Sequence, residues 1–138
     1  MTTAREAMTA GAECIGENDT IREAAKRLKE LQVGSVPICG TDDKLKGMVT
    51  DRDIAIKVVA AGLDPDSTTA GSLAKGKPVT IGADDTLEEA LRTMSEHRVR
   101  RLPVIDGHQL VGMLSQADLA RALPDEAAGD LIQAISQD

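Results

Sequence analysis

The sequence predicts an α/β fold in which two β-α-β-β-α repeats pack as one pseudo-symmetric module. Three observations lead to this prediction. The chain repeats itself at an offset of 66 residues. Each copy alternates short apolar stretches with an amphipathic helical pattern. One copy alone, at roughly 55 residues, buries too little surface to be comfortably stable, so the two copies are expected to pack against each other.

The repeat is clearest between residues 15–39 and 81–105, where nine of 25 aligned positions are identical. After a one-residue gap, LKGMVTDRDI (45–54) aligns with LVGMLSQADL (110–119). Chance would give roughly one or two identities in a stretch of this length, so a duplication is the better interpretation.

Each copy predicts the same elements in the same order. Thr20 and Thr86 precede an apolar stripe with helical spacing and are suitable N-caps, each followed three residues later by a Glu. The strand that follows the helix carries a proline in both copies, which suits a strand edge or start. The expected strands and helices are strands 14–15, 35–39 and 45–50 with helices 20–31 and 53–61, and strands 79–81, 101–105 and 110–115 with helices 86–97 and 116–123.

The expected domain organisation follows from the repeat. Residues 1–62 form the first repeat with an N-terminal helix, and residues 73–123 form the second. Residues 63–72, which are rich in Gly, Pro, Asp and Ser, are expected to be an ordered linker. The tail, 124–138, contains spaced apolar residues and is predicted to form a short helix.

Composition excludes several classes of function. The net charge of −7 argues against nucleic-acid binding, because phosphate binding requires a basic surface. The chain contains no Phe, Tyr or Trp, so no aromatic platform is available to stack on a base. It has no apolar run of membrane-spanning length and no apolar signal segment at its start, so we expect a cytoplasmic protein without a membrane partner.

The cysteines and histidines give weaker signals. Cys14 and Cys39 would lie within reach of each other across one small sheet, and a disulfide is expected to stabilise the first repeat. A cytoplasmic location would favour free thiols instead, so both states remain open. With only His97 and His108 in addition, no metal site is predicted. No combination of a nucleophile with a base indicates an enzyme.

A short motif occurs twice and carries a family resemblance. It reads Gly, two apolar residues, Thr or Ser, any two residues, and Asp, at residues 47–53 and 112–118. Each copy follows a proline-containing strand and a turn. With this arrangement the chain resembles a tandem pair of CBS domains, called a Bateman module, over nearly its whole length. Both cysteine positions and the VPICG and DRDI strings make it similar to the stand-alone CBS proteins of the hypoxic response.

The resemblance implies a cleft between the repeats that holds an adenosine-containing ligand, with AMP, ADP, ATP or S-adenosylmethionine as candidates. By position, Asp53 and Asp118 would accept hydrogen bonds from a ribose diol, and the Thr50 and Ser115 hydroxyls would bind phosphate. Arg100, in the basic cluster 97–101, would also contact phosphate. The strand residues that would flank the base are Ile15, Val36, Ile81 and Leu102. The alternative for the Thr/Ser and Asp pairs is that they only cap their helices.

We therefore expect a non-catalytic regulatory module that binds an adenosine compound and acts in a stress or hypoxia response. The alternative is a structural or partner-binding protein without a small-molecule ligand, whose protein partner the sequence does not identify. The resemblance also implies a homodimer formed through the second helix of each repeat. The apolar residues expected at that interface are Ile54, Val58, Ala61, Leu119, Ala122 and Leu123.

Overall fold

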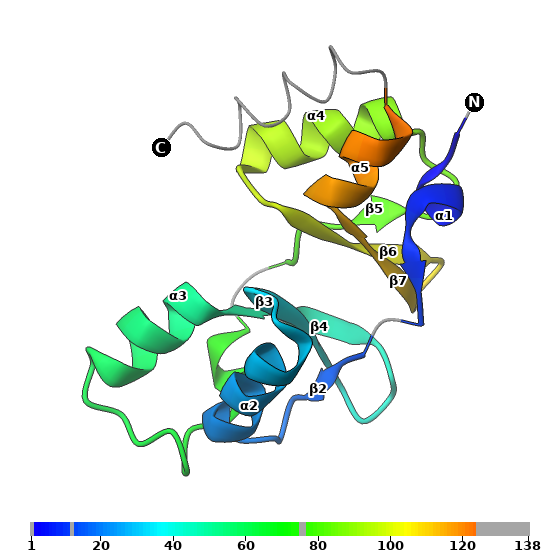
Figure 1. Cartoon of the computed structure of the whole chain (residues 1–138). Helices are drawn as coiled ribbons and strands as arrows, with labels where there is room; N and C mark the ends of the chain where they lie inside the picture. Colours follow the sequence, from blue (N-terminus) through cyan, green and yellow to red (C-terminus); the bar gives the residue numbers. More distant parts are fainter. Residues whose placement is uncertain (1, 12, 75–76, 124–138) are drawn as a thin grey trace. The chain divides into compact units, whose positions relative to one another are not determined.

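The structure is a computed structural model that describes residues 2–11, 13–74 and 77–123 (Figure 1). It divides into two compact units. One unit is Glu13–Pro78 and contains the first repeat. The other combines the N-terminal residues up to Ala12 with the chain from Val79 onward, and contains the second repeat. The expected helix in the tail, 124–138, lies outside the described residues.

The Glu13–Pro78 unit contains a three-stranded sheet with the order β2-β3-β4, in which β2 is parallel and β4 antiparallel to β3. The sequence predicted one helix at 53–61. The structure instead has the short helix α3, which continues directly into the π-helical segment η1. The elements of this unit are β2 (Ile15–Gly16), α2 (Ile21–Leu31), β3 (Ser35–Cys39), β4 (Leu45–Thr50), α3 (Asp51–Asp53), η1 (Ile54–Val59) and the 3₁₀ turn η2 (Ala70–Leu73).

The other unit repeats this arrangement and adds one strand at the sheet edge. Its strand order is β1-β7-β6-β5, with β5 parallel to β6 and both other pairs antiparallel. The elements are α1 (Ala4–Ala7), β1 (Thr9–Ala10), β5 (Ile81–Gly82), α4 (Leu87–His97), β6 (Arg101–Asp106), β7 (Gln109–Ser115) and α5 (Gln116–Ala122). The mixed α/β class and the two matching repeats confirm the predicted fold.

The first helix of each repeat begins and ends in the same way. The side chains of Thr20 and Thr86 accept a hydrogen bond from the backbone N–H of Glu23 and Glu89, each at 3.2 Å. The predicted N-caps are therefore confirmed. Both helices end at a residue in the left-handed conformation, Gln32 in α2 and the matching residue Arg98 in α4. This conformation turns the chain toward the next strand.

Each unit encloses its own aliphatic core. In Figure 1, α4 and α5 lie on the same side of the β5–β7 sheet, and the buried residues agree with this placement. The core of this unit comprises Ala4, Ile81, Ala83, Leu87, Ala90, Met94, Leu102, Val104, Leu114, Leu119 and Leu123. The core of the other unit comprises Ile15, Ile21, Ala24, Leu28, Val36, Ile38, Val49, Val58, Ala70 and Leu73. No helix among the described residues is long and apolar enough to span a membrane.

The segment before the first repeat packs on the second repeat, and the segment before the second repeat packs on the first. The N-terminal arm, which we define as residues 2–11, pairs β1 with β7 and forms an ion pair between Arg5 and Asp106 at 2.8 Å. In the same way, residues 64–74 belong to the first repeat, where the Ile21 N–H donates to the Thr68 carbonyl and Ala70 is buried. The compact units thus differ from the expected division, in which the N-terminal helix belonged to residues 1–62 and residues 63–72 were a linker.

The glycine of the duplicated motif is explained by this packing. A Cβ atom on Gly112 would lie 2.5 Å from the Met8 sulfur and 2.6 Å from the Thr9 carbonyl oxygen of the arm. A Cβ atom on Gly47 would lie 2.9 Å from the Cβ of Ala74, just after η2. All three distances are shorter than a Cβ atom tolerates, so Gly112 lets the arm approach β7 closely and Gly47 lets the chain after η2 approach β4.

Candidate ligand-binding residues in the two repeats

Thr50 and Asp53 form a capping box at the junction of β4 and α3. The Thr50 hydroxyl accepts a hydrogen bond from the Asp53 N–H at 2.9 Å. In return, the Asp53 carboxylate accepts one from the Thr50 N–H at 3.2 Å. The second oxygen of Asp53 lies 3.2 Å from the Lys57 ammonium group. The structure therefore brings the predicted pair together, and it gives the pair a capping role.

Ser115 and Asp118 repeat this geometry at the junction of β7 and α5. The Ser115 hydroxyl accepts from the Asp118 N–H at 3.0 Å, and the Asp118 carboxylate accepts from the Ser115 N–H at 2.9 Å. The second carboxylate oxygen forms an ion pair with Arg121. A carboxylate can accept about four hydrogen bonds, so capping alone does not saturate either group.

The four strand residues expected to flank a base are core residues. Ile15 and Ile81 are 3% and 4% exposed, and Val36 and Leu102 are 1% and 0% exposed. Each belongs to the aliphatic core of its own unit. Because side chains alternate between the two faces of a strand, these four point away from any ligand on the other face. A base-flanking role for their side chains is therefore not supported.

The opposite face of each sheet carries residues that the sequence reasoning missed. Directly opposite residues in an antiparallel pair share a face, so Pro37 and Met48 lie on the same face as Thr50. In the second repeat, Pro103 and Met113 share a face with Ser115. The alternation of apolar residues along 35–39 and 101–105 was the available signal, since it assigns Val36 and Leu102 to one face and the prolines to the other.

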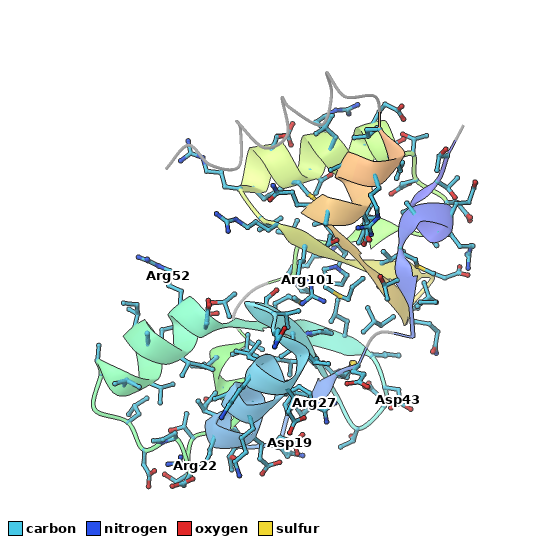
Figure 2. All side chains as sticks on the ribbon, in the orientation of Figure 1. Asp19, Arg22, Arg27, Asp43, Arg52 and Arg101 are labelled. Atoms are coloured by element: carbon cyan, nitrogen blue, oxygen red, sulfur yellow. A yellow bond between two sulfur atoms is a disulfide. The ribbon has the colours of Figure 1, made fainter. Side chains whose placement is uncertain are left out.

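The basic cluster 97–101 divides into exposed and half-buried positions. Arg100, the predicted phosphate contact, is exposed, and so is Arg98, which ends α4. Arg101 is half-buried at the start of β6 (Figure 2). Burial lowers the pKa of the Arg101 guanidinium below its ordinary value, and the nearby Asp118 carboxylate opposes this effect. Within the cluster 97–101, Arg101, which had no separate role in the prediction, is the residue on which the Asp118 charge acts.

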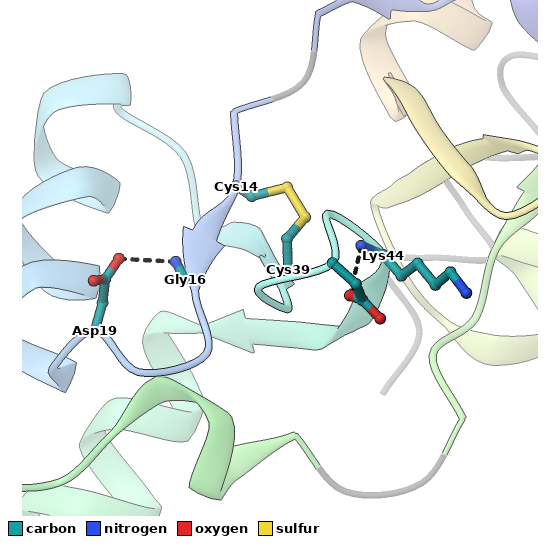
Figure 3. Close-up of a disulfide and its surroundings, with 6 residues drawn as sticks. Cys14, Gly16, Asp19, Cys39 and Lys44 are labelled. Atoms are coloured by element: carbon teal, nitrogen blue, oxygen red, sulfur yellow. Dashed lines mark hydrogen bonds between the residues drawn. A yellow bond between two sulfur atoms is a disulfide. The ribbon is translucent and has the colours of Figure 1, made fainter.

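The predicted partners Cys14 and Cys39 are joined by a disulfide in the structure, with their Cα atoms 5.6 Å apart (Figure 3). The bond links the residue before β2 to the last residue of β3, so it reinforces the parallel pairing of these two strands. Beyond β2, the Gly16 N–H donates to the Asp19 carboxylate at 2.8 Å. Gly82 and Asp85 form the same hydrogen bond in the second repeat, which has no cysteines.

The described residues contain no group of three or more His, Cys, Asp or Glu side chains placed to hold a metal ion. The absence of a metal site stays a prediction. The two sulfur atoms, which would be the best ligands for zinc, are bonded to each other. His97 and His108 are both exposed.

The residues expected at a dimer interface are partly core residues. Val58 and Leu119 are fully buried within their own units, and Leu123 is 8% exposed. The large apolar side chains exposed near the second helix of the first repeat are different ones: Ile56 at 54%, Val59 at 66% and Leu63 at 49%. Ile54 and Val58, four positions apart, pack into the core of their own unit, so the predicted stripe is the core-facing side of this segment.

The fold and these residues define a class of protein: a duplicated β-α-β-β-α module with a Thr/Ser-x-x-Asp capping box at the same place in each repeat. The family model for the CBS domain matches residues 4–60 and again residues 70–125. The chain therefore belongs to the CBS domain family, with two domains in tandem.

Known proteins resemble the whole chain. Hypoxic response protein 1 of Mycobacterium tuberculosis is 50% identical over 135 residues, which cover 98% of this chain and 94% of that protein. A crystal structure described as Hypoxic Response Protein I with two coordinated zinc ions matches with a TM-score of 0.84 and 52% identity, covering 89% of this chain and 100% of the other. A crystal structure of CBSX2 in complex with AMP matches with a TM-score of 0.77 and 25% identity, covering 88% and 96%.

Proposed function

We propose that this protein is a non-catalytic regulatory module that binds an adenosine-containing ligand through its paired CBS repeats. The observation that carries the proposal is the duplicated capping box, in which a carboxylate and a hydroxyl lie at the end of a strand. Pro37 and Met48, or Pro103 and Met113, lie on the same face. A base would rest against the half-buried Met48, since Pro37, Pro103 and Met113 are buried and the chain has no aromatic side chain.

The comparisons support the ligand class and the biological setting. CBSX2 is described in complex with AMP, and the relative from Mycobacterium tuberculosis carries the name of a hypoxic response protein. We infer a role in a stress or hypoxia response in the cytoplasm, in which the bound ligand changes how the module contacts a protein partner. The zinc ions of the related crystal structure are not part of the proposal, because the described residues hold no fitting donor group.

Ligand binding is expected to raise the melting temperature. An adenosine compound at 100 times its dissociation constant would add about 2.7 kcal/mol of stability. Without aromatic stacking, we expect the dissociation constant to be micromolar or weaker. Thermal-shift and calorimetric titrations with AMP, ADP, ATP, S-adenosylmethionine and adenosine test this. The variant Arg100→Ala should weaken the binding of the phosphorylated compounds more than the binding of adenosine. The control is Arg92→Ala, because Arg92 is an exposed arginine on α4. Absence of heat and of any melting shift at millimolar concentration would reject the proposal.

The second candidate function is partner binding, beginning with a second copy of this chain. It is favoured by the exposed strip Ile56, Val59 and Leu63. Two copies of an apolar strip cover each other when related by a twofold axis.

Substitution of the strip is expected to give a monomer. Wild-type protein should have twice the chain mass of 14.5 kDa in light scattering at micromolar concentration. Val59→Lys, at the most exposed position of the strip, should reduce this to a single chain mass, because a charge would have to be buried without a partner. Leu31→Lys is the matched control, since Leu31 is an exposed leucine at the end of α2. A monomeric wild type, or a dimer that tolerates Val59→Lys, would contradict the interface.

A further inference from the structure

The two capping carboxylates have the same hydrogen bonds to their own repeat but different surroundings. The Asp53 side chain is 23% exposed and pairs with Lys57, whose side chain is 46% exposed. The Asp118 side chain is only 6% exposed and pairs with Arg121. A ligand can therefore approach the carboxylate of the first repeat, whereas the carboxylate of the second repeat is enclosed.

A second arginine increases the difference. Arg101 lies opposite Ser115 in the register of β6 and β7, so its side chain stands on the same face as the capping pair. The Asp118 charge acts on its half-buried guanidinium group. In the first repeat, the residue opposite Thr50 is the uncharged Ser35. The second repeat thus pairs its carboxylate with Arg121 and has a further arginine, Arg101, on the same face of the sheet as Ser115.

In this arrangement Asp118 stabilises a half-buried guanidinium group, and Asp53 does not. A guanidinium group that is partly removed from water loses hydration free energy, which a neighbouring carboxylate offsets. Asp118 already accepts from the Ser115 N–H and from Arg121, and Arg101 lies on the same face of the sheet as Ser115. Asp53 accepts the corresponding two contacts, from the Thr50 N–H and from Lys57. What limits the approach of a ribose to Asp118 is therefore the burial of its side chain, which is only 6% exposed.

We propose that the chain presents one diol-accepting carboxylate, Asp53, and that Asp118 serves instead as the buried counter-ion of Arg101 and Arg121. The proposal rests on the proposed function for its ligand class. It assigns the ribose to the first repeat and gives Asp118 no contact with the ligand.

The binding test uses AMP as the probe in isothermal calorimetry. Wild-type protein should bind one AMP per chain. Asp53→Asn should weaken binding by about tenfold or more, the loss expected for hydrogen bonds to a charged group. Asp118→Asn keeps the shape of the side chain and should leave the affinity within about twofold, since it removes no ligand contact. Two AMP molecules per wild-type chain, or equal losses in both variants, would overturn the proposal.

A second test needs no ligand. Asp118→Asn should lower the melting temperature by about 5 °C or more, and Asp53→Asn by less than about 2 °C, because only the first leaves a half-buried arginine without its counter-ion. The shifts of Asp118→Asn and Arg101→Ser should be non-additive in the double variant. In the matched double-mutant cycle, the melting-temperature shifts of Asp53→Asn and Lys57→Gln should add. If the shifts of Asp118→Asn and Arg101→Ser add in the double variant, the counter-ion role is overturned. If the Arg101 cycle is non-additive but wild-type protein binds no AMP, the proposed function fails and the counter-ion role stands.

Discussion

Removal of the N-terminal arm is expected to unfold the second repeat while the first stays folded. The arm supplies β1 at the edge of the β7 strand, buries Ala4 completely and places Met8 against the core of this unit. It also forms backbone hydrogen bonds from Ala4 to Asp85 and from Arg5 to Ala83. A chain that begins at Glu13 loses all of these contacts at once. The arm does not belong to the Glu13–Pro78 unit, so the contacts within that unit are kept.

Hydrogen exchange measured by mass spectrometry can follow both repeats in one sample. Peptides from β6 and β7 should lose protection in the shortened chain, and peptides from β3 and β4 should keep theirs. Gly112→Ala is a milder form of the same change, because its Cβ would displace the arm. It should cost about 1–3 kcal/mol, as overpacking does. Unchanged protection of β7 in the shortened chain would show that the arm is dispensable.

The sequence was sufficient to predict the repeated elements because each one carries a local signal. The N-caps Thr20 and Thr86, the helical stripes and the turn residues all act within a few positions of the chain. The capping boxes at Thr50 and Ser115 also follow from their spacing, and the structure contains both. The family was recognisable for the same reason, since its motif is short and occurs twice.

The arm could not be assigned from the sequence because its contacts are not local. Thr9 pairs with Met113, more than a hundred positions away, and nothing near residue 9 specifies that partner. The different surroundings of Asp53 and Asp118 were missed for a related reason. Arg101 affects Asp118 only after β6 and β7 have paired. An alignment of the two repeats compares equivalent positions, and it does not show which residues are neighbours in space. The base-flanking role stays a prediction, and the structure adds that these four side chains lie in the cores of their own units.

Loss of the disulfide is expected to destabilise the first repeat strongly. The bond between Cys14 and Cys39 closes a loop with a sequence separation of 25. In the chain-entropy model, a loop of this length stabilises the folded state by about 3.5 kcal/mol, because the unfolded chain loses conformational freedom. The double variant Cys14→Ser with Cys39→Ser should therefore melt roughly 10 °C below the oxidised wild type.

Adding reductant to both proteins distinguishes the effect of the disulfide bond from the effect of replacing the two cysteine side chains. Reductant should lower the melting temperature of the wild type toward that of the double variant, and it should leave the double variant unchanged. Because the bond lies within the first repeat, hydrogen exchange should increase at β2 and β3 on reduction, while the cysteine-free second repeat keeps its protection. Two titratable thiols per chain in protein purified without reductant would contradict the bond. In that case the serine variant should melt close to the wild type, because neither chain would have a cross-linked unfolded state.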